Sequence, residues 1–143
     1  ALFQTGCRIS GLINIKYKDI KRNGSVKIKV TGKGNKSRTV YIKPDLYESI
    51  LKTFTKSNIY LFSNRNGNRF DRSNLFREIR SLARRVLGVY VGVHTFRHSC
   101  AMNLKTKGAS IKYISEYLGH ASTAITADFY FHDKPGAEVM EYF

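Results

Sequence analysis

Two turn signals on either side of one alternating segment constrain this fold more than any other feature of the sequence. Asn23-Gly24 is the strongest short signal for a tight hairpin, and it precedes the segment Val26 to Val30, in which aliphatic residues alternate with lysines. Thr31 to Asn35 is a second, glycine-rich turn that leads into Thr39 to Ile42. This arrangement predicts a small antiparallel three-stranded sheet with Lys33 at the tip of its second hairpin.

Helical spacing dominates the remainder of the chain. Apolar residues recur at intervals of three and four, with residues typical of helix starts and stops at the ends of these segments. Between the first helix and the sheet, an alternating pattern begins at Ile13 to Tyr17 and predicts that strands follow from there. The expected helices are Arg8 to Leu12, Leu46 to Phe54, Ser73 to Leu87, His94 to Lys107, Ser110 to Leu118 and Ser122 to Tyr130.

These elements predict an α+β fold: a mainly helical domain with a small antiparallel three-stranded sheet. The 143 residues fit one domain, 1–143, and a domain of this size buries roughly two thirds of its unfolded surface. The chain begins without an initiator methionine, and Leu2 and Phe3 resemble the tail of a helix already under way. We therefore expect the sequence to be a piece of a longer polypeptide.

The charge of the chain predicts a polyanionic partner. The sequence has 25 lysines and arginines against 10 aspartates and glutamates, which gives a formal net charge of +15 and a pI near 10.0. Such an excess favours nucleic acid, although an acidic membrane surface would also attract it. No apolar run approaches the roughly 20 residues that span a bilayer, and no signal peptide is present. We therefore expect a soluble, intracellular protein without a membrane partner.

The two cysteines are expected to be packed side chains without a reactive role. Cys7 and Cys100 are the only two in the sequence, so they do not form a disulfide framework. The cysteines and histidines also lack the spacing of a zinc site. We interpret each thiol as a small packed side chain.

One set of side chains has the chemistry to clamp, protonate and attack a single phosphate. A tyrosine hydroxyl is a weak nucleophile near neutral pH because its ordinary pKa is about 10, so the phosphate must be activated around it. Guanidinium groups bind non-bridging oxygens in pairs, histidines donate hydrogen bonds or carry protons, and a lysine can protonate the leaving oxygen. The candidate residues for these tasks are Arg8, Lys33, His94, Arg97, His120 and Tyr130.

Taken together in this order, the motifs resemble the tyrosine recombinase family, which includes the phage-type integrases and the Xer-like resolvases. The resemblance runs along nearly the whole chain through five boxes in the family's order. The boxes are Thr5-Gly-Cys-Arg8-Ile-Ser, Gly32-Lys-Gly-Asn-Lys-Ser-Arg38, His94-Thr-Phe-Arg97-His-Ser, Tyr117-Leu-Gly-His120-Ala and Tyr130-Phe-His132.

The resemblance implies a role for each box. Arg8 and Arg97 would bind the scissile phosphate, supported by His94 and His120, and Lys33 would be the general acid. Tyr130 would attack phosphorus and form a 3′-phosphotyrosyl link, which a partner strand's 5′-hydroxyl would later reverse. Neither a metal nor another cofactor is expected. Family members act on double-stranded DNA as synaptic tetramers, and they place a separate DNA-clamping domain before the catalytic one, which this sequence lacks.

The sequence departs from the family pattern at two places. Gly11 stands where the family usually has a glutamate that helps to hold the first arginine box. The stretch from His120 to Tyr130 is one residue longer than expected, so simple counting puts Phe129 at the position of the nucleophile. Phenylalanine has no hydroxyl, and we therefore choose Tyr130, with the remote Tyr142 as the alternative.

Two further questions stay open at the level of the sequence. Lys36 and Arg38 flank Lys33, and we expect at least one of them to contact the DNA phosphate backbone. The function expected is that of a site-specific recombinase or integrase. The alternatives are a type IB topoisomerase, which relaxes DNA by controlled rotation, and a DNA-binding module that has lost its reactivity.

Overall fold

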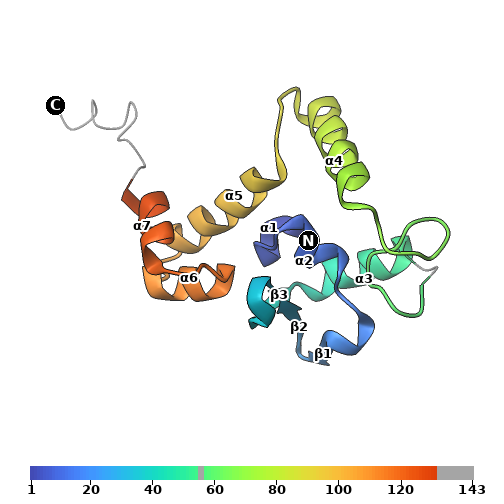
Figure 1. Ribbon diagram of the computed structural model, residues 1–143, viewed down its shortest axis with the longest axis horizontal. Helices are drawn as coiled ribbons and strands as arrows, with labels where there is room; N and C mark the ends of the chain where they lie inside the picture. Colours follow the sequence, from blue (N-terminus) through green and yellow to red (C-terminus); the bar gives the residue numbers. More distant parts are fainter. Residues whose placement is uncertain (55–56, 132–143) are drawn as a thin grey trace.

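A computed structural model describes residues 1–54 and 57–131 of the chain (Figure 1). Its sheet has three antiparallel strands in the order β1-β2-β3. The fold class expected from the sequence is confirmed, because helices make up most of the other elements. The strands are β1 (Ile20–Asn23), β2 (Ser25–Thr31) and β3 (Ser37–Ile42).

The two predicted turns set the register of the sheet. Gly24 adopts φ +68° between β1 and β2, a conformation that glycine reaches without the clash of a Cβ atom. The 3-10 turn η2 (Lys33–Asn35) joins β2 to β3, and the Gly32 N–H donates to the Lys36 carbonyl at 2.8 Å. Lys33 therefore lies in the second hairpin, as expected.

Short helical elements precede the sheet in the chain, and the longer helices follow it. Asp71 caps the start of α4 by accepting from the Asn74 N–H at 2.8 Å, and Gly88 ends this helix with φ +70°. Ser110 caps α6 in the same way, which Gly119 ends. The helices are α1 (Leu2–Thr5), α2 (Ile9–Ile13), the 3-10 turn η1 (Tyr17–Asp19), α3 (Pro44–Thr53), α4 (Arg72–Leu87), α5 (Val93–Thr106), α6 (Ile111–Leu118) and α7 (Thr123–Phe131).

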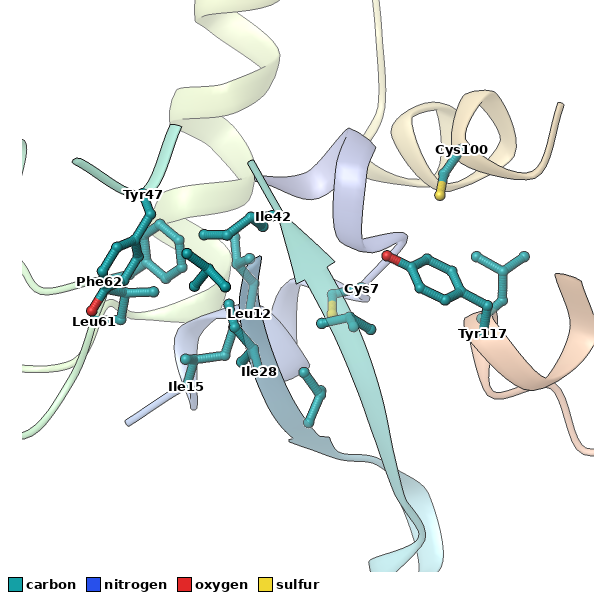
Figure 2. Close-up of a cluster of buried hydrophobic side chains, with 14 of the residues drawn as sticks. Cys7, Leu12, Ile15, Ile28, Ile42, Tyr47, Leu61, Phe62, Cys100 and Tyr117 are labelled. Atoms are coloured by element: carbon teal, nitrogen blue, oxygen red, sulfur yellow. The ribbon is translucent and has the colours of Figure 1, made fainter. Parts of the chain in front are cut away.

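One face of the sheet forms the centre of the core (Figure 2). On β2, every second side chain is buried while Lys27 and Lys29 point to the solvent, because successive residues of a strand face opposite sides. The helices α1, α2, α3 and α6 contact the strands of the sheet. The buried side chains labelled in the close-up are Cys7, Leu12, Ile15, Ile28, Ile42, Tyr47, Leu61, Phe62, Cys100 and Tyr117.

The segment Ile13 to Tyr17 is where the predicted start of the strands is wrong. Ile13 ends α2, and Tyr17 begins η1, so the sheet starts only at Ile20. The alternation arises because the segment pairs with a different part of the chain: the Leu61 N–H donates to the Ile15 carbonyl and the Tyr17 N–H to the Ile59 carbonyl, each at 3.0 Å. The pairing is a single isolated bridge and does not extend the sheet.

Helix α4 projects from the rest of the molecule (Figure 1). Its first half packs through Leu75 and Ile79 against buried residues of α2 and α5. Its second half does not continue this contact, since Leu82 is 50% and Val86 67% exposed. Apolar residues at helical spacing therefore predicted the helix correctly, but only half of its apolar face is buried.

Candidate active site

The turn between α1 and α2 holds the first arginine box in place. Gly6 ends α1 with φ +57°, and a Cβ atom here would lie 2.4 Å from Leu118 Cδ2 and 3.2 Å from Cys100 Sγ. Arg8 follows as the N-terminal cap residue of α2, with an exposed side chain. The residues on both sides of it, Cys7 and Ile9, are buried, so the backbone of Arg8 is fixed by packing.

Gly11 shows how α2 is held without the glutamate that the resemblance led us to expect. A Cβ atom at this position would lie 3.3 Å from Val30 Cγ1 on β2, which is a tight contact. The absence of a side chain lets α2 approach the sheet closely. Arg8, one turn earlier in the chain, is thus anchored through the docking of its helix.

Arg97 lies almost fully inside the protein, on α5. Its side chain is 8% exposed, and its Nη1 donates to the Gly6 carbonyl at 2.5 Å. Its Nη2 is buried and has no hydrogen-bond partner among the described residues. A buried donor without a partner is costly in free energy, so its presence marks a position where a binding partner would be favoured.

His120 reaches the same region from the turn after α6. Gly119 ends the helix with φ +69°, and the ring of His120 is held by Thr126 of α7 through an Nδ1 to Oγ1 contact of 2.7 Å. Burial, together with the positive charges of Arg97, Arg8 and Arg38, lowers the pKa of His120 to about 4. The imidazole is therefore neutral near pH 7 in the free protein.

Arg38 is the third guanidinium group in this region, and its position was not foreseen. We expected a contact with the DNA backbone for Lys36 or Arg38; the structure leaves Lys36 exposed and turns Arg38 partly inward. Its Nε donates to the Tyr117 carbonyl at 2.7 Å, and its Nη2 donates to Cys7 Sγ at 3.6 Å. The contact of either residue with DNA stays a prediction.

The three guanidinium groups affect one another. Burial, together with the charges of Arg8 and Arg38, lowers the pKa of Arg97 to about 10. Arg97 nevertheless stays protonated near neutral pH. Three cations around a partly desolvated point produce a strong local preference for an anion. We call Arg8, Arg38, Arg97 and His120 the guanidinium cluster.

The other predicted catalytic residues come from three elements. His94 is exposed on α5, three positions before Arg97 and hence on the same side of the helix. Lys33 lies at the hairpin tip and Tyr130 in the last turn of α7, but the side chains of both are outside the described part of the structure. His132 and Tyr142 also lie outside the described residues. The roles assigned to all these residues stay predictions.

Tyr117 has a structural role that the sequence gave us no reason to assign. Its hydroxyl donates to the Gln4 carbonyl at 2.9 Å and accepts from the Tyr41 N–H at 3.2 Å. Figure 2 shows the ring pointing from α6 toward β3. Burial raises the pKa of Tyr117 to about 12, so this hydroxyl keeps its proton. The available signal was its spacing from Ile114 and Leu118, which marks the inner face of α6.

Two further findings concern only the residues that the structure describes. Within 1–54 and 57–131, no helix is long and apolar enough to cross a membrane. In the same ranges, histidine, cysteine, aspartate and glutamate side chains do not gather in groups of three or more that would suit a metal ion. The expectation that the chemistry needs neither metal nor cofactor stays a prediction.

Comparison with known sequences finds integrases and tyrosine recombinases. The sequence model of the phage integrase family matches residues 1–136. A probable integrase/recombinase protein of Methanocaldococcus jannaschii is 36% identical, over 99% of this chain and 46% of that protein. The tyrosine recombinase XerA of Pyrococcus horikoshii is 34% identical, over 87% of this chain and 46% of that protein. The chain thus spans about half the length of the curated relatives that it matches.

Solved structures share the same fold. The XerA recombinase superposes with a TM-score of 0.80 at 33% identity, over 99% of this chain and 54% of that one. The XerH site-specific recombinase in a post-cleavage complex with palindromic difH substrate superposes with a TM-score of 0.82 at 28% identity. That match covers 99% of this chain and 43% of the XerH chain.

Proposed function

Because the chain belongs to the phage integrase family, we propose that it is the catalytic domain of a site-specific DNA recombinase that cleaves and rejoins strands through a 3′-phosphotyrosyl intermediate. One observation carries this proposal above all. The buried Arg97 Nη2 lacks a hydrogen-bond partner among the described residues, in a region that also contains Arg8, Arg38 and His120. A phosphate oxygen is the partner that such a donor favours.

The guanidinium cluster supports phosphate binding by its charge as well as its geometry. Arg97 is held by Gly6, and Arg8 lies two residues further along the same turn, so both guanidinium groups can approach one phosphate. Their preorganised charge would stabilise the pentacoordinate phosphorus of the transition state. A bound phosphate would also offset the cations and raise the pKa of His120, which prepares its imidazole to donate or carry a proton.

The proposed reaction is a pair of transesterifications. The Tyr130 oxygen bonds to phosphorus as the bond to the 5′ oxygen of the sugar breaks, and Lys33 gives that oxygen a proton. His94 and His120 would hydrogen-bond to the phosphate and take up the tyrosine proton. The 5′-hydroxyl of a partner strand then attacks the phosphotyrosine and releases Tyr130. The number of phosphate ester bonds is unchanged, so the reaction requires no nucleotide cofactor.

We assign the nucleophile to Tyr130 and not to its neighbour because the phenylalanine at position 129 has no hydroxyl group. Position 130 follows Thr126 by four residues, so it lies on the same face of α7 as the residue that holds His120. Position 129 follows Thr126 by three residues and lies on the same side of the helix, so the choice between the two positions rests on the hydroxyl group.

The partners follow from the same proposal. The substrate would be double-stranded DNA carrying a recombination site, bound through phosphate contacts that include the exposed Lys36. Exchange between two duplexes requires four cleaving subunits, so we propose a synaptic tetramer on DNA. A protein with this substrate would act inside the cell that holds the DNA.

A suicide-substrate experiment tests the proposal directly. The protein is incubated with a pool of nicked duplexes whose sequence is randomised around the nick, so that the cleaved short strand diffuses away and religation is prevented. We expect a protein–DNA adduct that survives denaturation and whose DNA can be sequenced to identify the site. Tyr130→Phe should abolish the adduct, while the matched control Tyr113→Phe, which alters an exposed tyrosine on α6, should keep it.

Each other outcome identifies a different error. An adduct that survives in Tyr130→Phe would move the nucleophile elsewhere, with Tyr142 the next candidate. DNA binding without an adduct would favour a module that has lost its reactivity. Relaxation of supercoiled DNA without exchange between two duplexes would favour a type IB topoisomerase.

A further inference from the structure

Arg38 connects two turns that are far apart in the sequence. It lies on β3, and its Nε donates to the carbonyl of Tyr117 in the last turn of α6 at 2.7 Å. On the other side, its Nη2 donates to Cys7 Sγ at 3.6 Å, next to Arg8. One planar side chain thus contacts both the segment before His120 and the segment before Arg8.

The turn that bears His120 also packs directly on this side chain. A Cβ atom at Gly119 would lie 2.9 Å from Arg38 Nη1 and 3.2 Å from its Cδ. Glycine therefore allows the backbone next to His120 to rest against the guanidinium group. Arg38 fixes this turn by contact as well as by its hydrogen bond to Tyr117.

We propose that Arg38 is a positioning residue, which sets the location of His120 relative to Arg8 and Arg97 and does not itself hold the DNA. This inference rests on the function proposed above. The half-buried guanidinium group uses two of its nitrogens within the protein and packs a third against Gly119, which leaves it a poor contact for an outer phosphate. Its neighbour Lys36 is exposed on the same hairpin, where its charge can reach a phosphate.

The charge of Arg38 supports a role in the reaction over a purely structural one. A third cation beside Arg8 and Arg97 raises the electrostatic energy of the free protein, and a neutral side chain would serve better as a simple link. Among the described residues, the groups that act on His120 include Arg97 on α5, Arg8 in the α1–α2 turn, Arg38 on β3 and Thr126 on α7. The three cations among them favour the neutral imidazole until an anion is bound.

Two variants of Arg38 and one control test this inference. Arg38→Met keeps the bulk of the side chain but removes its charge and donors, while Arg38→Lys keeps the charge and loses the planar fork. The control is Lys27→Met, which removes one charge from the exposed face of the same sheet. For each protein we would measure the rate of adduct formation at saturating DNA, the salt dependence of DNA binding, and the pKa of His120 by NMR titration of its ring.

The expected pattern separates positioning from DNA binding. Arg38→Met should slow adduct formation by about 10- to 100-fold, the range expected for misplacing a catalytic group by a fraction of an ångström to 1 Å. It should raise the pKa of His120, and the slope of log affinity against log salt should match that of the control. Arg38→Lys should show a smaller loss of rate and leave the pKa of His120 close to its original value.

Three results would overturn the inference. The first is an Arg38→Met rate within about 2-fold of the Lys27→Met control. The second is a salt slope reduced by about 1 compared with that control, which indicates a lost phosphate contact. The third is an unchanged pKa of His120. If Arg38→Met does not unfold cooperatively, Arg38→Lys decides by its rate and salt slope.

Failure of the proposed function looks different. In that case the unmodified protein and Lys27→Met would give no adduct that depends on Tyr130. The NMR titration of His120 does not require cleavage, so it still tests whether Arg38 positions His120. An unchanged pKa of His120 in Arg38→Met would reject this inference, and a raised pKa would support it.

Discussion

The guanidinium cluster and helix α4 both carry arginines, but they hold them in opposite ways. In the cluster, Arg97 is 8% exposed and donates a hydrogen bond to the Gly6 carbonyl. Arg38 donates hydrogen bonds to the Tyr117 carbonyl and to Cys7 Sγ. On α4, every arginine is exposed and Ala83 is the one buried residue. Arg80 and Arg84 lie over the exposed ring of Tyr90, at 5.4 and 4.9 Å from its centroid.

This difference shows what tertiary structure adds to a charge. A desolvated arginine surrounded by other cations has a single geometry and a lowered pKa, which suits one anion at one place. An exposed arginine on a helix keeps its hydration and its freedom, so it can follow the charge of a polyanion without fixing any single group. The cluster is therefore suited to catalysis and the α4 arginines to affinity.

The largest expected effect comes from removing the buried arginine. Arg97→Met should slow adduct formation by at least about 100- to 1000-fold, the usual cost of removing one preorganised donor to the transition state. The unfolding temperature should change little, because the lost bond to Gly6 is offset by removing a desolvated charge. The matched control on α4 is Arg85→Met. An equal loss of cleavage activity in both variants would contradict the distinction between the buried cluster and the exposed α4 arginines.

The second prediction concerns the glycines that end α1 and α4. Gly6→Ala should destabilise the fold by about 2–3 kcal/mol, since a left-handed residue gains a Cβ that collides with Leu118. Gly88→Ala has a similar positive φ but open space around it, so it should cost only about 1–2 kcal/mol. Urea unfolding of both variants measures the difference. Equal losses would mean that packing does not hold the cluster more tightly than the end of α4.

The third prediction is a pH dependence of stability that arises in the cluster. The pKa of His120 is about 4 in the folded protein, below the ordinary value of 6.5, so the unfolded chain binds the proton first as the pH falls. His120 therefore contributes stability above about pH 6.5 that is lost progressively toward pH 4. His120→Gln should flatten the unfolding free energy in this window, which urea unfolding at a series of pH values measures. An unchanged slope in His120→Gln would contradict the prediction.

The smallest effect is expected on α4. If the exposed α4 arginines bind the DNA backbone, Arg84→Gln should lower the slope of log affinity against log salt by about 1, the effect expected for one lost phosphate contact. Adduct formation at saturating DNA should change far less than in Arg97→Met. Lys52→Gln, which removes an exposed charge from α3, is the control for net charge. A slope that falls equally in both variants would contradict a special role for the α4 surface.

Much of the fold was predictable because its signals are local. The Asn23-Gly24 turn and the alternation along β2 fix a hairpin over a few residues, and the caps of α4 and α6 are visible as Asp71, Gly88 and Ser110. The prediction failed at Ile13 to Tyr17, where the chain pairs with Ile59 to Leu61. A pairing across more than forty residues leaves no mark on local periodicity.

The sequence by itself determined which chemical groups are available and in what order, because a helical or strand period and a box of adjacent residues are local properties. It therefore identified Arg8, Arg97 and His120 as a set. Only the tertiary structure decided which charges are desolvated and which remain in water. Burial depends on contacts between distant segments, and these turn Arg38 inward to Tyr117 and Cys7 while Lys36, two residues earlier, stays exposed.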